Sequence, residues 1–321
     1  MCIALISTAH PSYSLIIIDN RDEYLRRPTS PADWWPEPES NILGGRDLAR
    51  ATHGTWMGIT KEGKIAVLTN YREDTTEKAT GTQSRGAIVN GWLTEAPEPR
   101  QSTRDFAQSM VASPMVRNVG GFSLVCGYVN EPLAVISNRS SNMDQVTWLA
   151  TEQGQTVGLS NTHFDDRSWP KIIDGEKLMI EAIQEHVDAG EDEDGLIDRL
   201  LGLLSRNTLP ELSEDATAED YLPHFRKSIF IPVLGAKGGP AKPAEGVAAA
   251  CVEEKVTTGA KQGDELDQSY LHGAYGTQKQ TVILVSHVGR VRYFERTLYD
   301  DEVNAVPLGK GDRSYEFQVT Q

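Results

Sequence analysis

The sequence contains few cysteines and no segment long and apolar enough to suggest a membrane span. Cys2, Cys126 and Cys251 are the only three cysteines in 321 residues, and they form no CxxC pair. That count and spacing argue against a disulfide framework and against a zinc knuckle. No stretch approaches the roughly 20 apolar residues that cross a bilayer, and the start lacks the basic leader of a secretory signal. We therefore expect a soluble chain in a reducing compartment.

Positive charge is also scarce. The chain has 46 acidic and 31 basic side chains, which gives a formal net charge of -15. Such a field repels nucleic acid and anionic headgroups, so we expect no nucleic-acid partner. The seven histidines form no HExxH, HxH or CxxCH pattern, which argues against a metal site and against covalent haem. No cofactor is required by any motif.

Hairpins dominate the pattern of the first half of the chain and of its end. The apolar runs 2–6 and 15–18 are separated by a turn at His10 and Pro11, which predicts a first hairpin that begins with Cys2. The same signals predict hairpins that join 55–60 to 65–69, 122–129 to 133–137, and 281–287 to 290–297. Sheets of this kind are antiparallel.

Helical periodicity occupies the segments between these hairpins. It is present at 84–94 and 102–111, and it is clearest at 172–187 and 196–204, where Ile and Leu recur at helical spacing. Helices grouped between hairpins predict an α+β architecture, with two sheets covered by helices in an αββα sandwich.

Segment 235–268 does not fit a core. It is rich in Gly, Ala, Pro, Lys and Glu and holds almost no large apolar side chain. We predict a flexible insertion inside a single domain that covers residues 1–321.

Cys2 is a candidate nucleophile because it follows the initiator methionine. Aminopeptidases remove Met1 when the next side chain is small, and we expect Cys2 to become the first residue. Its α-amine, with an ordinary pKa of about 7.7–8.0, could then serve as base for its own thiol, whose ordinary pKa is about 8.5. The alternative is that Cys2 is a small buried core residue.

Four adjacent polar residues, Asn20-Arg21-Asp22-Glu23, follow the second apolar run. We expect them at a sheet end beside a pocket. Arg21 could favour a thiolate, and Asp22 could accept a hydrogen bond from the free amine. The alternative is a surface turn with a local salt bridge.

With these residues the sequence resembles the NRDE-domain family, which includes proteins of the transport and Golgi organisation type. The resemblance runs in order over nearly the whole chain outside the predicted insertion. Its motifs are Met1-Cys2-Ile3, Asn20-Arg21-Asp22-Glu23, Gly54-Thr55-Trp56 with Gly58, Leu68-Thr69-Asn70-Tyr71-Arg72, Ser84-Arg85-Gly86, Gly120-Gly121-Phe122, Ser137-Asn138-Arg139, Gly158-Leu159-Ser160-Asn161, Trp169-Pro170-Lys171, Tyr275-Gly276-Thr277 and Glu295-Arg296.

The resemblance implies an N-terminal-nucleophile (Ntn) hydrolase-like fold, similar to the choloylglycine hydrolase and penicillin V acylase group. By that likeness Cys2 would be nucleophile and base, Arg21 and Asp22 would tune the thiol and the amine, and the amides of Asn70 and Asn161 would lie near the nucleophile. The implied ligand-binding residues are Asn20, Glu23, Arg85 and Gln278. Many relatives carry Arg at the position of Gln278, so a second pocket cation is in question.

Two functions are implied. The first is an intracellular protein for Golgi organisation and secretion that handles haem or an acyl-lipid in an Ntn-like pocket, in the cytoplasm with association with Golgi or mitochondria. The second is a cysteine amidohydrolase that cleaves a non-peptide C–N bond with Cys2. The expected partner is accordingly haem, acyl-CoA or an amide substrate, with haem as a transported ligand.

Other residues carry weaker expectations. Cys126 and Trp56 lie inside strand patterns and are expected in the core. Trp34 and Trp35, in a Pro-rich loop, either cover the pocket or pack on the domain edge, and we favour packing on the edge. His163 is expected beside the site or on the surface.

Overall fold

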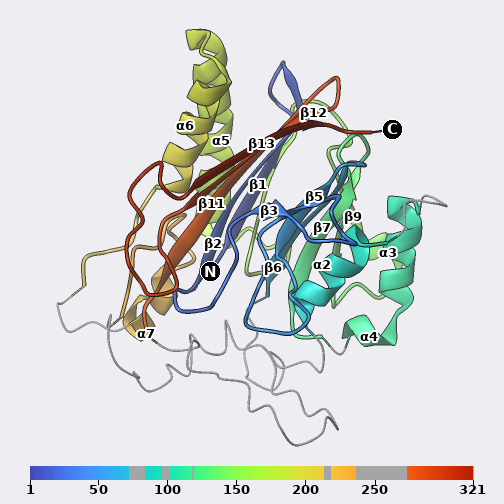
Figure 1. The fold of residues 1–321 in the computed structure, drawn as a ribbon, viewed down its shortest axis with the longest axis horizontal. Helices are drawn as coiled ribbons and strands as arrows, with labels where there is room; N and C mark the ends of the chain where they lie inside the picture. Colours follow the sequence, from blue (N-terminus) through green and yellow to red (C-terminus); the bar gives the residue numbers. More distant parts are fainter. Residues whose placement is uncertain (72–83, 96–100, 118, 213–217, 236–272, 321) are drawn as a thin grey trace, which may run out of the picture.

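Two antiparallel sheets lie face to face, with helices on their outer faces (Figure 1). This computed structural model describes residues 1–321 except 72–83, 96–100, 118, 213–217, 236–272 and 321. The predicted α+β class and αββα sandwich are confirmed. The single-domain organisation stays a prediction, and residues 236–268 of the predicted insertion lie outside the described residues.

The first sheet carries the start of the chain on an inner strand. Its six strands, in spatial order, are β10 (Thr156–Ser160), β1 (Ile3–Ser7), β2 (Tyr13–Tyr24), β11 (Tyr275–Ser286), β12 (Arg290–Thr297) and β13 (Asp312–Gln318). Every pairing between these neighbours is antiparallel. Strand β1 is therefore enclosed on both edges, and the residues that begin the chain lie at the end of an inner strand.

The second sheet is an antiparallel meander in chain order. Its seven strands are β3 (Asp33–Trp34), β4 (Ile42–Gly44), β5 (Met57–Thr60), β6 (Lys64–Asn70), β7 (Phe122–Tyr128), β8 (Leu133–Ser137) and β9 (Thr147–Leu149). The predicted hairpins 122–129 with 133–137 and 281–287 with 290–297 are confirmed, and the other two differ mainly in strand ends.

Helices cover the outer face of each sheet. Helices α5 (Pro170–Ala189) and α6 (Glu193–Leu204) pack on the first sheet, whereas α2 (Arg85–Leu93) and α3 (Thr103–Ala112) pack on the second. The short elements α4 (Pro114–Arg117), η1 (Met143–Gln145), α7 (Ala218–Tyr221) and η2 (Leu222–His224) complete the described helices. Among the described residues, none of the helices combines the length and apolarity needed to cross a bilayer.

Three apolar layers hold the sandwich together. Side chains such as Ile17, Val67 and Val125 fill the space between the sheets. Ile18 packs outward against the helices of the first sheet, and Leu124 packs outward against those of the second. Neighbours along β2, such as Ile17 and Ile18, thus serve different layers because successive strand side chains point to opposite faces.

Strand β2 extends further than its apolar run indicates. Asn20 to Glu23 continue the strand instead of following it, because all four pair with β11, and Asn20 also pairs with β1. The expected sheet end thus lies beyond the four polar residues. Alternation places Asp19, Arg21 and Glu23 on the face between the sheets, and Asn20 and Asp22 on the face toward the helices.

Helix α5 begins close against the first sheet. Pro170 occupies its first turn, where a missing N–H costs no intrahelical bond. At Gly175 a Cβ atom would lie 3.1 Å from a side-chain carbon of Leu5, so glycine permits the close approach. Ile172 and Ile183 are buried, whereas Ile173, Ile180 and Val187 of the same periodic set are exposed. The approach of α5 brings Lys171 to the first residues of the chain.

Candidate functional site

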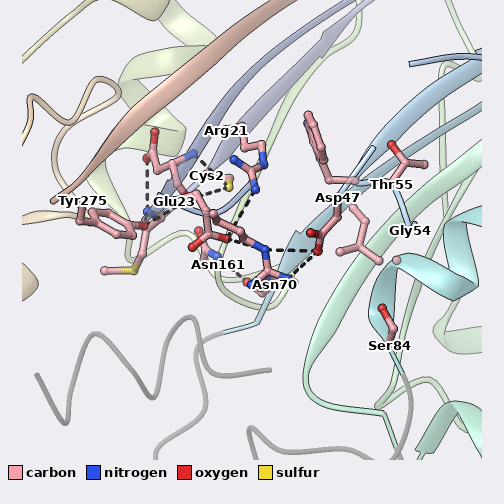
Figure 2. Close-up of a pocket in the computed structure, with 16 residues that line it drawn as sticks. Cys2, Arg21, Glu23, Asp47, Gly54, Thr55, Asn70, Ser84, Asn161 and Tyr275 are labelled. Carbon is pink, nitrogen blue, oxygen red and sulfur yellow. Dashed lines mark hydrogen bonds and ion pairs between the residues drawn. The ribbon is translucent and has the colours of Figure 1, made fainter. Parts of the chain in front are cut away.

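A small pocket lies where the first residues of the chain meet the ends of both sheets (Figure 2). Its described walls enclose about 60 Å³. Its lining includes the side chains of Cys2, Arg21, Asp22, Glu23, Asn70, Asn161 and Tyr275. All five residues predicted to be catalytic therefore border one cavity, although they come from four different strands or strand ends.

The Cys2 thiol rests against the backbone of β2. Its sulfur lies 3.4 Å from the amide nitrogen of Asp22, which donates to it, and 3.6 Å from the carbonyl oxygen of the same residue. Burial raises the pKa of the Cys2 thiol to about 11, and the positive charge at the chain start only partly opposes this rise. With Met1 in place the thiol is therefore a weak nucleophile at neutral pH.

Asp22 connects β2 to the start of the chain. Its Oδ2 lies 3.3 Å from the terminal nitrogen of Met1, and its Oδ1 accepts a 2.7 Å hydrogen bond from the hydroxyl of Thr277. The hydroxyl of Tyr275 accepts a hydrogen bond from the same terminal nitrogen. The expected orientation of a terminal amine by Asp22 is thus present, although the amine in this structure belongs to Met1.

Arg21 lies beside the thiol on the face between the sheets. Its guanidinium is 4.6 Å from the ring centroid of Trp56 and donates to the side-chain oxygen of Gln278. One nitrogen is 3.8 Å from a carboxylate oxygen of Glu23. These contacts fix a delocalised cation at the pocket wall. Trp56, which we expected in the core, packs against the apolar layer between the sheets but is only half-buried, and it also lines the pocket.

A second buried guanidinium lies next to Glu23. Arg27 is paired with Asp47 at 2.5 Å, and its Nε is 4.0 Å from Glu23. All three residues line the pocket. Alternating acidic and basic groups therefore make the wall polar, and the arrangement suits a ligand with hydrogen-bonding groups at its buried end.

Asn70 and Asn161 come from β6 and from the residue after β10, and they meet across the pocket floor. The amide nitrogen of Asn161 donates a 2.7 Å hydrogen bond to the carbonyl oxygen of Asn70. An amide nitrogen carries two hydrogens, so one donor of Asn161 is used by this bond. The described geometry holds both side chains at the cavity that Cys2 borders (Figure 2).

Three of the four predicted ligand-binding residues lie outside the pocket lining. Asn20 donates to the carbonyl oxygens of Leu204 and Ile229, since its side chain points toward the helices. Arg85 is buried and donates to the carbonyl oxygen of Gly121. Gln278 lies behind Arg21 and acts as its acceptor. Glu23 alone of the four is a wall residue.

Lys171 belongs to the motif Trp169-Pro170-Lys171, but no feature of the sequence predicts that it lies near the site. Its Nζ donates to the carbonyl oxygen of Met1 at 2.6 Å and to that of Cys2 at 3.3 Å. Burial lowers the pKa of the Lys171 ammonium to about 8, and Asp22 and the Cys2 thiol oppose this effect. The adjacent Trp169-Pro170 pair signals the helix start, but a lysine in a first helical turn normally extends into solvent.

Asp19 is a further buried group that sequence reasoning missed. It is fully enclosed on the face between the sheets, and burial together with Asp22 raises the pKa of its carboxyl to about 8. One carboxyl oxygen of Asp19 has no hydrogen-bond partner among the described residues. Within β2 it is the first polar residue after an apolar run, which is the only signal available.

The other aromatic, cysteine and histidine side chains considered in the sequence, Trp34, Trp35, Cys126 and His163, lie outside the pocket lining. Trp34 packs on Tyr315 and Phe317, as expected of packing on the domain edge. Trp35 is instead buried in the apolar layer between the second sheet and its helices, where its ring nitrogen donates to the carbonyl oxygen of Gly44. Cys126 is buried in the core as predicted. His163 is exposed, at the surface. Within the described part of the chain, no group of three or more His, Cys, Asp or Glu is arranged to hold a metal ion.

Comparisons with known proteins identify close relatives in sequence. Residues 1–300 match the family described as Transport and Golgi organisation 2. The mouse protein named Transport and Golgi organization 2 homolog is 26% identical over 296 residues, which cover 91% of this chain and 90% of that protein. The human homolog is 27% identical over 309 residues, which cover 96% of this chain and 94% of that protein. A solved structure of a Caenorhabditis elegans N-acylethanolamine-hydrolyzing acid amidase ortholog aligns with a TM-score of 0.43 at 13% identity, over 62% of this chain and 85% of that chain.

Proposed function

The chain belongs to the Transport and Golgi organisation 2 family, and on this premise we propose that its site is that of a cysteine amidohydrolase with Cys2 as nucleophile. The observation that carries the proposal is the position of Asp22, whose buried carboxylate lies 3.3 Å from the terminal nitrogen while its backbone contacts the Cys2 sulfur. Removal of Met1 would place the α-amine of Cys2 beside the same carboxylate.

The reaction follows from the groups at hand. The free α-amine of Cys2 takes the thiol proton, and the sulfur attacks the carbonyl carbon of an amide. The C–N bond then breaks, the amine returns its proton to the leaving nitrogen, and a thioester remains on Cys2. Water attacks that thioester, with the α-amine again as base, to release a carboxylic acid and the thiol.

The amide groups of Asn70 and Asn161 supply hydrogen-bond donors for the tetrahedral intermediate. Both border the cavity with Cys2, and the Asn161 amide is already fixed by its bond to the Asn70 carbonyl oxygen. A preorganised donor of this kind stabilises a transition state by about 3 kcal/mol. Arg21 and Arg27 add fixed positive charge for an anionic or polar end of the substrate.

The test begins with the intact mass of the purified protein, which reports whether Met1 is present. The protein is then exposed briefly to iodoacetamide, with Cys2→Ala as the variant and Cys126→Ala as the matched control. We expect loss of Met1, rapid labelling that depends on Cys2, and hydrolysis of N-acyl amides that Cys2→Ala abolishes. A retained Met1, or equal amide hydrolysis by Cys2→Ala, would overturn the proposal.

A second candidate, ligand carriage without catalysis, is favoured by one observation. In the chain with Met1 in place, the Cys2 thiol has a raised pKa and its nitrogen is part of a peptide bond. Such a protein could hold an anionic ligand, such as haem, acyl-CoA or a fatty acid, through the two guanidiniums. A cavity of about 60 Å³ is smaller than the roughly 300–1,000 Å³ of typical ligand pockets, which favours entry of only the end of such a ligand.

Equilibrium binding separates this candidate from the first. Saturable micromolar binding of haem or acyl-CoA that is unchanged in Cys2→Ala and lost in Arg21→Met would support ligand carriage. Absence of binding would end it. Under either candidate we propose a role in transport and Golgi organisation, the process for which the relatives are named. We further propose that the protein acts in secretion from the cytoplasm.

A further inference from the structure

Lys171 is a buried cation that the proposed reaction does not yet use. Its side chain is fully enclosed, although lysine is almost never buried without a compensating partner. The partners of its Nζ are two backbone carbonyl oxygens, those of Met1 and Cys2. These two hydrogen bonds place the Lys171 ammonium next to the backbone of Cys2.

The two carbonyls bracket the nitrogen of Cys2. The Met1 carbonyl belongs to the same planar peptide group as this nitrogen, and the Cys2 carbonyl follows two bonds later. Removal of Met1 deletes the acceptor at 2.6 Å and converts the neighbouring nitrogen into an α-amine. The ammonium of Lys171 then faces that amine across the space that the Met1 carbonyl occupied.

We propose that Lys171 is a positioning residue that keeps the Cys2 α-amine unprotonated and therefore able to accept the thiol proton. The proposal rests on the proposed hydrolase function. Two neighbouring cations repel strongly in a buried site, so ionised Lys171 disfavours an ammonium on Cys2. Its remaining bond to the Cys2 carbonyl oxygen holds the first residue in place.

Other charged and titratable groups face the same point. From β2 come Asp22 and Asp19, from the residue before β1 the Cys2 thiol, and from β11 the hydroxyl of Tyr275. The Asp22 carboxylate favours positive charge near the start of the chain, and Asp19 does the same once the pH rises above about 8 and its carboxyl ionises, so one cation is stabilised there. Burial lowers the pKa of Lys171 to about 8, which brings the two amines close enough to titrate as a coupled pair.

The experiment measures the titration of the Cys2 α-amine. Protein labelled with [13C]cysteine contains three labelled residues, and the Cys2 carbon shifts are followed from pH 5 to pH 10. The variants are Lys171→Met, Lys171→Gln and Lys171→Arg, each checked by circular dichroism. Gln keeps a hydrogen-bond donor without charge, and Arg keeps the charge.

We expect the apparent pKa of the α-amine to rise by about one to two units in Lys171→Met and in Lys171→Gln, and to stay near the wild-type value in Lys171→Arg. The pH profile of Cys2 alkylation by iodoacetamide should move with it. An unchanged amine titration in both neutral variants would overturn this proposal alone. So would a wild-type titration in Lys171→Gln with a shift confined to Lys171→Met, because that pattern indicates a hydrogen-bonding role. Retention of Met1 in the wild-type protein would overturn the hydrolase function and this proposal together.

Discussion

The hydroxyl of Thr277 donates a 2.7 Å hydrogen bond to Oδ1 of Asp22, and this bond determines which carboxylate oxygen faces the start of the chain. Oδ2 is left 3.3 Å from the terminal nitrogen. Thr277 itself is anchored, since its hydroxyl also accepts a bond from the backbone nitrogen of Ile231. The orientation of Asp22 is therefore fixed before any substrate binds.

Asp22→Asn should impair catalysis without removing the Thr277 bond, because an amide oxygen can replace Oδ1. The amide nitrogen would then face the α-amine of Cys2, and a donor would oppose a donor. We expect amide hydrolysis to fall about 100-fold or more. Steady-state hydrolysis of an N-acyl amide checks this, with Thr277→Val as the matched control that keeps the charge and loses only the anchor. Equal rates for wild type and Asp22→Asn would show that the carboxylate has no part in the reaction.

The alternation along β2 explains which site residues sequence reasoning placed correctly. Once 13–24 is one strand, Arg21 and Glu23 must share the face between the sheets, and Asn20 must share the opposite face with Asp22. Treating 20–23 as a segment beyond the strand removed that constraint, so Asn20 was expected in the pocket. Polar residues rarely continue an inner strand, and here β11, from the far end of the sequence, keeps them paired.

Lys171 and Asp19 could not be predicted from local pattern. The burial of Lys171 depends on the approach of α5 at Gly175 and on carbonyl acceptors at the opposite end of the sequence. The enclosure of Asp19 depends on the second sheet closing over the first. By contrast, Cys2, Arg21 and Asp22 were candidates from their positions in the sequence, Asn70 and Asn161 were added by the family resemblance, and the fold gathers all five at one cavity. Hairpin and helix positions followed from periodicity and turn residues alone.

The ion pair between Arg27 and Asp47 should contribute to stability as well as to the pocket wall. The Arg27 side chain is 2% exposed, so loss of its partner leaves a poorly compensated buried charge. We expect Asp47→Ala to lower the free energy of unfolding by about 3 kcal/mol. Urea denaturation measures this, and Glu181→Ala, which breaks the exposed pair with Lys177, should cost less than about 1 kcal/mol. Equal losses would mean that the other partners of Arg27 compensate its charge.

Asp19 should make the fold less stable at alkaline pH. Burial raises the pKa of its carboxyl to about 8, so the folded state holds this proton more tightly than the unfolded chain does. The stabilisation is complete below pH 4 and is lost as the pH rises through about 8, a change on the order of 5 kcal/mol. Urea denaturation at pH 5 and pH 9 should show this fall, and Asp19→Asn should flatten it. An identical pH dependence in Asp19→Asn and in the exposed control Asp301→Asn would contradict the prediction.

In protein that keeps Met1, the enclosure of this residue should make the start of the chain intolerant of extension. Met1 is 2% exposed and packs in an apolar cluster with Trp169 and Phe225. A Gly-Ser extension at this end moves the positive charge away from Asp22 and Tyr275 and leaves the Asp22 carboxylate buried without its cation, which should cost about 3 kcal/mol in unfolding free energy. The same extension after the C-terminal residue should be neutral, because the neighbouring Thr320 is exposed. Urea denaturation of the two extended proteins tests this directly. Equal stability would mean that the terminal charge and Asp22 are not coupled, whereas a loss confined to the N-terminal extension would show that the chain start is held by the same carboxylate that we assign to the Cys2 amine.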